Sequence, residues 1–427
     1  MTMQYCKMSQ EQLREELNVQ KTRYDAYMAK GLSYDMTRGK PCTEQLDLSN
    51  GILDESLVAD VKTEGGLDCR NYGVLTGIPE ARALMGAMLG VPADQVIVGG
   101  NSSLNMMHDL LAFFMLHGTS QSGKPWCKEE KVKFICPVPG YDRHFGVTQS
   151  LGFELIPVDL LPDGPDMDRI EALVKSDASI KGMWSVPKYS KPTGYVYSDD
   201  CIRRLASMPT AADDFRIMWD DAYTIHFLGD APVEQLNLIE ACKEAGNPDR
   251  AIMIASTSKI TFPGAGIAAI ASSPANIAYF TKLLSNQTIG SDKMNQLRHV
   301  RFLKDREGLL AHMRKHADIL RPKFQAVLEV FDREMTGLDI LSWTKPEGGY
   351  FISIDVPEGC ASKVVAMAKA CGVAFTPAGA TYPCGVDPLD RNIRIAPSFP
   401  PLSQIGTAIE VLCICIKICA LEKLLNK

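Results

Sequence analysis

The chain has 427 residues, of which 46% are hydrophobic and 22% are charged, so it can bury a large core and two domains are expected rather than one. Its formal net charge of −6, without a basic stripe, argues against nucleic acid or an anionic membrane surface as a partner. The 13 cysteines lie in apolar contexts without metal-ligand spacing to histidines, which predicts reduced core cysteines, no metal site and a cytoplasmic protein.

The first predicted element is an amphipathic helix over residues 9–30. Apolar residues recur there at helical spacing, Ser9 with Gln12 three positions later matches a capping box, and Gly31 ends the helix. The segment ahead of the helix, M-T-M-Q-Y-C-K, is polar and lacks the apolar core of a signal peptide. No signal peptide is therefore expected.

Short apolar strands alternate with helical stretches over the middle of the chain. The strand candidates are Q-V-I-V-G, V-K-F-I-C-P, F-E-L-I-P-V, G-M-W-S-V-P, I-M-W-D, A-I-M-I-A-S and G-I-A-A-I-A-S. Strands that are apolar throughout, with helices between them, are typical of a parallel sheet that is covered on both faces. The sequence therefore predicts an α/β fold whose large domain contains a mostly parallel, seven-stranded sheet between helices.

The pattern after this region changes to a long helix, short strands and further helices, which predicts a smaller α+β domain. We expect residues 46–305 to form the large, cofactor-binding domain and residues 306–427 to form the small C-terminal domain. Residues 1–45, an N-terminal helix and a substrate loop, are assigned to the small domain. The last helix is the most hydrophobic stretch, but a glutamate and a lysine interrupt it, so a buried helix is expected rather than a membrane span.

One lysine stands in a context that suits an aldehyde cofactor. Lys259 lies in S-T-S-K-I-T-F-P-G-A-G, between small hydroxyl residues and a Gly-rich turn. Upstream, the buried strand in R-I-M-W-D-D-A-Y ends near Asp220 and Tyr223. Pyridoxal phosphate requires a carboxylate that keeps its ring nitrogen protonated and a phenol that reaches its O3′ oxygen. Asp220 and Tyr223 are the candidates for these two roles, because ligands of open α/β sheets collect at the strands' C-terminal edge.

The same cofactor needs a phosphate site and a platform for its flat ring. The segment V-I-V-G-G-N-S-S-L reads as strand, glycine turn and helix N-terminus, which places Asn101, Ser102 and Ser103 where the helix dipole favours an anion. Tyr141, in P-V-P-G-Y-D-R after the strand V-K-F-I-C, is the candidate platform. The sequence thus offers one candidate for each part of pyridoxal phosphate.

The order G-G-N-S-S, P-G-Y, Y-S-K-P-T-G, D-D-A-Y, S-T-S-K and I-R-I-A-P resembles the class I aminotransferases of fold type I, over nearly the whole chain. Two further stretches, M-T-R-G-K-P and S-D-K-M-N-Q-L-R-H, resemble the divergent bacterial subgroup described as aspartate-aminotransferase-like. The resemblance implies that Lys259 is the Schiff-base lysine, that Asp220 pairs with the ring nitrogen and that Tyr223 donates to O3′.

The resemblance also implies the substrate contacts and a dimer. Tyr141 would stack on the ring, and Arg394 would bind the substrate α-carboxylate. Tyr72, in R-N-Y-G-V-L-T-G, matches the tyrosine that crosses a dimer interface to the neighbouring subunit's phosphate, so a homodimer with active sites at the interface is expected. Arg38 and Gly39, in the N-terminal T-R-G-K-P loop, are expected to contact the substrate.

Two positions depart from the class pattern. Lys191 stands where the class carries asparagine before Pro-Thr-Gly, and a lysine cannot copy the geometry of an amide. Its ammonium either points at O3′, where it disfavours protonation of the Schiff base, or points away and leaves that contact unmade. The usual phosphate-binding arginine is replaced by residues 264–266, Gly-Ala-Gly. The phosphate must then depend more on Ser256, Ser258 and the turn at residues 101–103, with Lys191 as a further candidate.

The expected activity is transfer of an amino group from an amino acid to a 2-oxo acid such as 2-oxoglutarate, through a Schiff base of pyridoxal phosphate. Lys259 supplies the acid and base function, so His108, His144 and His299 are expected to be packing or surface residues. Which bond at Cα breaks depends on an orientation that a sequence does not display, so a β-eliminating lyase stays open as an alternative.

The expected amino donor is aspartate or another dicarboxylic amino acid, whose distal carboxylate needs a second cation. A transaminase for non-dicarboxylic amino acids is the alternative. The candidate cations are Arg38, Lys40, Lys293 and Arg298.

Overall fold

The computed structural model describes residues 4–426, and its largest sheet has eight strands in the order β2-β9-β8-β7-β6-β3-β4-β5. Strands β3, β4, β6, β7 and β8 are parallel, β9 is antiparallel to β2 and β8, and β5 is antiparallel to β4. The strands are β2 (Val96–Val98), β3 (Lys133–Val138), β4 (Glu154–Leu161), β5 (Gly164–Pro165), β6 (Ile180–Ser185), β7 (Arg216–Asp220), β8 (Ala251–Ser256) and β9 (Ala268–Ser272).

The predicted α/β fold with a mostly parallel sheet is confirmed, and all seven predicted strands are present. The eighth strand, β5, has only two residues, Gly-Pro, so it is too short to show the periodicity by which a strand is predicted.

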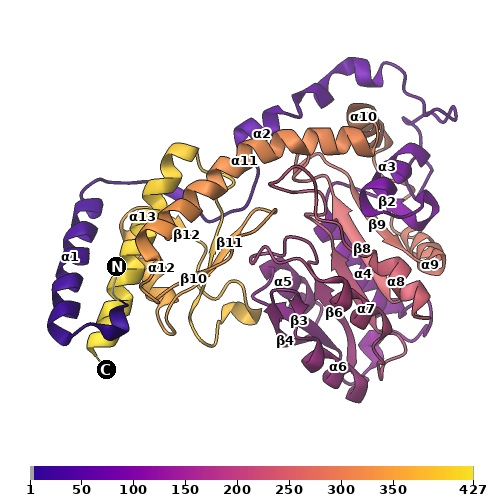
Figure 1. The fold of residues 1–427 in the computed structure, drawn as a ribbon. Coiled ribbons are helices and arrows are strands. Elements are labelled where there is room, and N and C mark those ends of the chain that lie inside the picture. The colour runs from indigo at the N-terminus through magenta and orange to yellow at the C-terminus, as the bar shows by residue number, and fades with distance from the viewer. Residues whose placement is uncertain (1–3, 427) are drawn as a thin grey trace.

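Helices cover both faces of this sheet, and each face has its own hydrophobic core (Figure 1). On β7, Ile217 and Trp219 join one core whereas Met218 joins the other, because successive side chains of a strand point to opposite faces. Helices α4, α5 and α9 contribute to the core of Met218, and α3, α6, α7 and α8 contribute to the other. The helices are α3 (Pro79–Leu89), α4 (Ser103–His117), α5 (Asp142–Ser150), α6 (Met167–Ser176), α7 (Asp199–Ser207), α8 (Leu238–Glu244), α9 (Pro274–Leu284) and α10 (Lys293–Leu303).

The C-terminal elements form a second layered unit beside the large sheet (Figure 1). Strands β10, β11 and β13 make a three-stranded antiparallel sheet, and helix α13 packs on α11 and α12. The elements are α11 (Arg306–Met335), β10 (Ser342–Trp343), β11 (Ile352–Asp355), α12 (Ala361–Ala370), β12 (Val373–Phe375), β13 (Asn392–Ile395) and α13 (Leu402–Leu425).

The N-terminal segment packs on these C-terminal elements although it is the most distant from them in sequence. Helix α1 (Gln10–Met28) packs along α13, and strand β1 (Tyr34–Met36) pairs in parallel with β12, so indigo and yellow ribbons lie together in Figure 1. The predicted capping box of α1 is present, because Ser9 and Gln12 exchange hydrogen bonds between side chain and backbone. The remaining elements are α2 (Thr43–Asp47) and 3₁₀ turns at Tyr5–Lys7, Asn50–Leu53, Glu55–Val58, Ala93–Gln95, Trp126–Lys128 and Pro383–Gly385.

The hydrophobic helix α13 is a core helix that carries a buried charge. Lys417 is 7% exposed, and its Nζ lies 2.8 Å from Oε2 of Glu334 on α11. Arg23 of α1 donates to the same oxygen at 3.2 Å, so one carboxylate joins three helices. Burial alone would raise the pKa of Glu334, but the hydrogen bonds and charges of Lys417 and Arg23 outweigh it and lower the pKa to about 2. Within residues 4–426, no helix is long and apolar enough to cross a membrane.

Replacing Glu334 by glutamine should lower the free energy of unfolding by about 3 kcal/mol at pH 7, because it leaves the Lys417 ammonium buried without a counter-charge. The folded-state pKa of Glu334 is depressed from 4.5 to about 2, so its contribution is present above pH 4.5 and is lost as the pH falls through about 2. Urea unfolding at several pH values measures this difference. The double variant Glu334→Gln/Lys417→Met is the control and should recover most of the loss; a difference that stays constant down to low pH would contradict the assignment.

Candidate active site

A buried carboxylate with one unused oxygen lies at the carboxyl end of β7. Asp220 is 3% exposed, and its Oδ2 is 2.9 Å from Nε2 of His144. Its Oδ1 is buried and has no hydrogen-bond partner among the described residues. Because leaving a buried charged acceptor unpaired is costly, this oxygen is suited to a cationic N–H donor of a ligand.

His144 is fixed in its position by the aromatic core of the sheet. Its ring stacks on Trp184 with centroids 4.1 Å apart and planes 7° from parallel. The sequence predicts that His144 is a packing or surface residue; the structure shows it buried and hydrogen-bonded to Asp220. This role has no sequence motif of its own, since the two residues are 76 positions apart.

Lys259 and Tyr223 lie near Asp220. Lys259 follows β8, the strand that pairs with β7, and its Nζ lies 4.7 Å from the centre of the Tyr223 ring. Burial lowers the pKa of Lys259, and the nearby charge of Asp220 partly opposes this. Burial also raises the pKa of the Tyr223 phenol well above its usual range. The structure therefore brings the three predicted catalytic residues together at one edge of the sheet.

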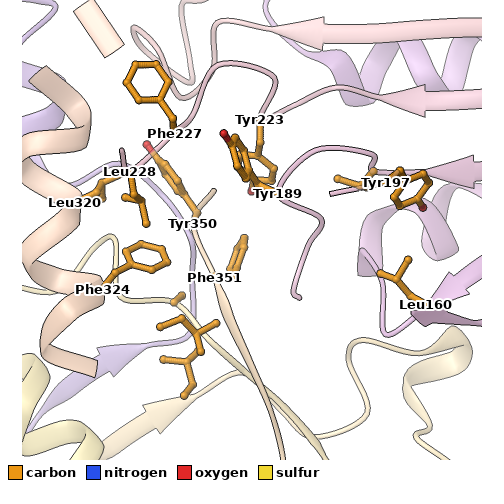
Figure 2. Close-up of a cluster of buried hydrophobic side chains, with 14 of the residues drawn as sticks. Leu160, Tyr189, Tyr197, Tyr223, Phe227, Leu228, Leu320, Phe324, Tyr350 and Phe351 are labelled. Carbon is orange, nitrogen blue, oxygen red and sulfur yellow. The ribbon is translucent and has the colours of Figure 1, made fainter. Parts of the chain in front are cut away.

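Aromatic side chains surround the space next to Tyr223. Figure 2 shows Tyr223, Tyr189, Tyr350 and Phe351 gathered at one place, with Phe324 of the long helix α11 beside them. The rings of Tyr223 and Tyr350 have centroids 5.9 Å apart. These rings limit the access of water to the polar groups among them, which strengthens electrostatic interactions there.

Lys191 contacts the predicted ring platform. Its Nζ lies 3.5 Å from the centre of the Tyr141 ring and 4.9 Å from that of Phe351. The nearest carboxylate oxygen is Oδ1 of Asp142, at 3.8 Å. Burial and then the charge of Arg394 lower the pKa of Lys191 well below its usual range, although Asp142 opposes them.

Arg394 reaches the same cluster from β13, across the gap between the two units. The guanidinium is 7% exposed; Nη1 donates to Oδ1 of Asp142 and Nη2 to Oγ1 of Thr376, both at 3.3 Å. The Nε atom is buried and has no partner among the described residues. Arg394 is thus a desolvated cation with a donor to spare, which suits the binding of a carboxylate.

The N-terminus of α4 lies against the lysine loop. Ser102 caps this helix and accepts a hydrogen bond from the backbone of Asn105, and Ser103 is its first residue. Ser258 donates to the carbonyl of Asn101 at 3.4 Å, and Ser256 donates to Ser258 at 3.0 Å. A cavity of about 180 Å³ adjoins this turn and is lined by residues 99–102 among others. Ser256 and Ser258 therefore lie beside the turn that precedes α4, near the helix N-terminus.

The other predicted residues differ in how close they are to this site. Gly39 packs on the ring of Phe351, where any larger residue would overlap the aromatic atoms, whereas Arg38 is exposed. Tyr72 is 81% exposed and makes no contact with the cluster around Lys259. Lys293 is buried and donates to the backbone carbonyl of Gly73.

A buried histidine pair, which the sequence analysis does not identify, holds the backbone after Lys259. Nε2 of His312 and Nε2 of His316 lie 2.9 and 3.1 Å from the carbonyl oxygen of Ile260. The two histidines are four positions apart on α11, so they share one helix face, and this spacing was the available sequence signal.

Hydrogen-bond chemistry determines the tautomer of His316. The backbone N–H of Cys42 donates to Oε1 of Gln45 at 3.2 Å, which fixes the orientation of that amide. The Gln45 amide nitrogen then donates to Nδ1 of His316 at 3.0 Å and to the Tyr350 hydroxyl at 2.8 Å, and Tyr350 donates to the Lys259 carbonyl at 3.5 Å. His316 Nδ1 must therefore accept, so its proton sits on Nε2. Burial, followed by His312, lowers the pKa of His316 to about 3.

The chain matches known proteins over almost its whole length. The model of the family described as aspartate amino-transferase matches residues 8–427. A relative from Mycolicibacterium smegmatis is 48% identical over 426 residues, which are 99% of this chain and 100% of that protein. The aspartate aminotransferase of Corynebacterium glutamicum is 45% identical over 95% of this chain and 94% of its own length.

Solved structures give the same result. The crystal structure of an aspartate transaminase from C. glutamicum superposes with a TM-score of 0.97 at 43% identity and covers 99% of this chain and 100% of that one. The chain belongs to the aspartate aminotransferase family, so it is an aminotransferase of fold type I.

Replacing Gln45 by leucine should leave the His316 ring and the Tyr350 hydroxyl without their shared donor, and should cost about 1–3 kcal/mol of unfolding free energy. Because this network ends on the Lys259 and Ile260 carbonyls, hydrogen exchange of residues 257–261 should become faster. Exchange measured by mass spectrometry checks this. Gln325→Leu, an exposed substitution on α11, is the control and should change neither quantity appreciably; unchanged exchange in Gln45→Leu would refute the role of the network.

Proposed function

We propose that this aminotransferase uses pyridoxal phosphate to move an amino group from aspartate, or another dicarboxylic amino acid, to a 2-oxo acid such as 2-oxoglutarate. The observation that carries the proposal is the unpaired, buried Oδ1 of Asp220 beside Lys259 and Tyr223. A protonated ring nitrogen is a cationic donor of the kind that this oxygen lacks. The remaining cofactor parts have partners nearby, so the residues present fit the group.

When bound, the cofactor supplies an aldehyde that condenses with amines and a ring that withdraws electrons from the carbon bearing the amino group. Asp220 pairs with the ring nitrogen, and His144 keeps the carboxylate in place through its hydrogen bond to Oδ2. Tyr223 serves as the donor to O3′. Tyr141 provides a platform beside the ring, in an arrangement that also includes the Lys191 ammonium.

Lys259 acts both as the amine that holds the cofactor and as the base that moves the proton at the substrate Cα. Its lowered pKa supports this role, because a larger fraction of the side chain is then a neutral amine near neutral pH. The Gln45, Tyr350 and histidine network on the adjacent carbonyls keeps the loop in one position while the side chain moves.

The anionic groups of cofactor and substrate would bind at opposite ends of the site. Ser102, Ser103, Ser256 and Ser258 would hold the phosphate with their hydroxyl groups at the N-terminus of α4, where the helix dipole favours an anion and Asn101 lies in the same turn. Arg394 binds the substrate α-carboxylate in a bidentate pair, for which its free Nε is a ready donor.

The dicarboxylic substrate is proposed from the family and from the C. glutamicum relative, which is named aspartate aminotransferase. The distal carboxylate needs a cation that is free to bind it, and the exposed Arg38 beside Gly39 is the candidate in this chain. Lys293 is less suited, because it already donates to Gly73.

We also propose a homodimer with its active sites at the interface. An 81% exposed tyrosine in a turn, Tyr72, is suited to reach a neighbouring subunit's phosphate. A cytoplasmic location fits the free state of all cysteines among the described residues.

Borohydride treatment of the cofactor-loaded protein, followed by peptide mapping, should place the reduced cofactor on Lys259. Lys191 is the control, because it is the other lysine whose charge acts in this site. Lys191→Met should keep the label, and Lys259→Ala should lose both the label and the turnover. A label on Lys191 in the wild type would overturn the assignment.

Aspartate or glutamate should be preferred over alanine by at least about tenfold in kcat/KM with 2-oxoglutarate as acceptor, which corresponds to about 1.4 kcal/mol. The reason is that the cation proposed to bind the distal carboxylate gains no counter-charge from a substrate with a single carboxylate. Arg38→Met should reduce this ratio while leaving the rate with alanine nearly unchanged. Equal rates for aspartate and alanine in the wild type would refute the dicarboxylic preference but not the transfer reaction.

A further inference from the structure

The proposed carboxylate clamp already contains a carboxylate from the chain itself. Asp142 Oδ1 accepts from Nη1 of Arg394 at 3.3 Å and lies 3.8 Å from Nζ of Lys191, so both cations converge on one oxygen. The ring of Phe351 contacts both cations, with the Lys191 ammonium 4.9 Å and the Arg394 guanidinium 5.1 Å from its centre. The four residues form one cluster, which we call the clamp cluster.

The energetics of burial explain why a carboxylate is needed here. The side chains of Arg394 and Lys191 are 7% and 13% exposed, and two like charges held so close together would be costly without a counter-charge. Burial would raise the pKa of Asp142, but Lys191 and Arg394 outweigh this effect and hold the pKa below its usual range. The Asp142 carboxylate is therefore ionised and compensates the clamp.

Asp142 is also the member of the cluster that is most free to leave. Its side chain is 39% exposed, several times more than those of its two partners. It is the first residue of α5, and the exposed Arg143 follows it, so the carboxylate can turn toward water and still have a cation nearby. Both contacts to the clamp are long for charged hydrogen bonds, which marks them as replaceable.

We propose that Asp142 is a specificity-determining residue, a built-in counter-ion that the carboxylate of the substrate must displace from Arg394 and Lys191. This inference rests on the proposed role of Arg394 as the substrate clamp. Binding then exchanges one carboxylate for another, and the clamp is never left without a counter-charge.

The exchange gives the site selectivity among anions. A simple anion gains little, because it only replaces contacts that Asp142 already makes. An amino acid also presents an amine to the cofactor, and this further bond makes the displacement favourable. Asp142 thus acts as a repulsive element against ligands that offer a carboxylate alone, which is how specificity by exclusion operates.

The test uses propionate, a carboxylate without an amino group, and measures its dissociation constant on the cofactor-loaded protein by calorimetry. Asp142→Asn should bind propionate at least about tenfold more tightly than the parent, which corresponds to about 1.4 kcal/mol. Both proteins carry Lys191→Met, so that a change in the ionisation of Lys191 does not enter the comparison. Asp142→Ala should behave in the same way, which guards against an effect of the new amide.

Thr376→Val is the matched control, because Thr376 accepts from Nη2 of Arg394 at the same 3.3 Å but carries no charge. It should not tighten propionate binding, and propionamide should bind all variants equally weakly. If Asp142→Asn and Asp142→Ala bind propionate no more tightly than the parent, or if Thr376→Val tightens it equally, Asp142 is not the competitor.

Arg394→Met separates this inference from the proposed function. It should abolish propionate binding. Undiminished binding in Arg394→Met would refute the clamp itself, whereas lost binding together with an unchanged Asp142→Asn would refute only the role of Asp142.

Discussion

The site depends on one carboxylate that lies in the interior of the protein with one oxygen unpaired. Asp220 lies at the end of a strand whose residues are all buried, so the sheet that positions it also removes its water. His144 is hydrogen-bonded to Oδ2 of Asp220, and its stacking on Trp184 holds the ring in that position, so Oδ1 stays unpaired. Leaving this oxygen unpaired costs free energy in the ligand-free protein, and a cationic donor on a ligand removes that cost. The position is therefore selective for such donors.

The surrounding charges follow from the same constraint. The charge of Asp220 opposes the loss of the proton from Lys259, but burial has the larger effect and lowers the pKa of the amine. Asp142 likewise opposes the loss of the proton from Lys191. Each lysine is therefore paired with an aspartate by charge, and the two pairs lie at the edge where parallel strands end.

The sequence predicts the residues at the sheet edge better than it predicts the residues that contact them and hold them in place. Asp220 ends one apolar strand, Tyr223 follows it, and Lys259 follows the neighbouring apolar strand. Because the carboxyl ends of parallel neighbours lie together, the meeting of these three residues could be predicted. Arg394 and Asp142 are 252 positions apart and come from different units. Arg394 could be predicted only because the sequence resembles a known family. The roles of Asp142 and Gln45 depend on how side chains far apart in the sequence are oriented, and no periodicity of the sequence encodes this.

Lys191, which departs from the asparagine of the class pattern, shows how one residue determines what charge its neighbours must carry. An asparagine at that position is neutral and needs no counter-charge, whereas a buried lysine does. The chain supplies this charge one residue after Tyr141, at Asp142, where the start of a helix already favours a carboxylate. The lysine at position 191 and the carboxylate of Asp142 therefore belong together, because each lowers the electrostatic cost of burying the other.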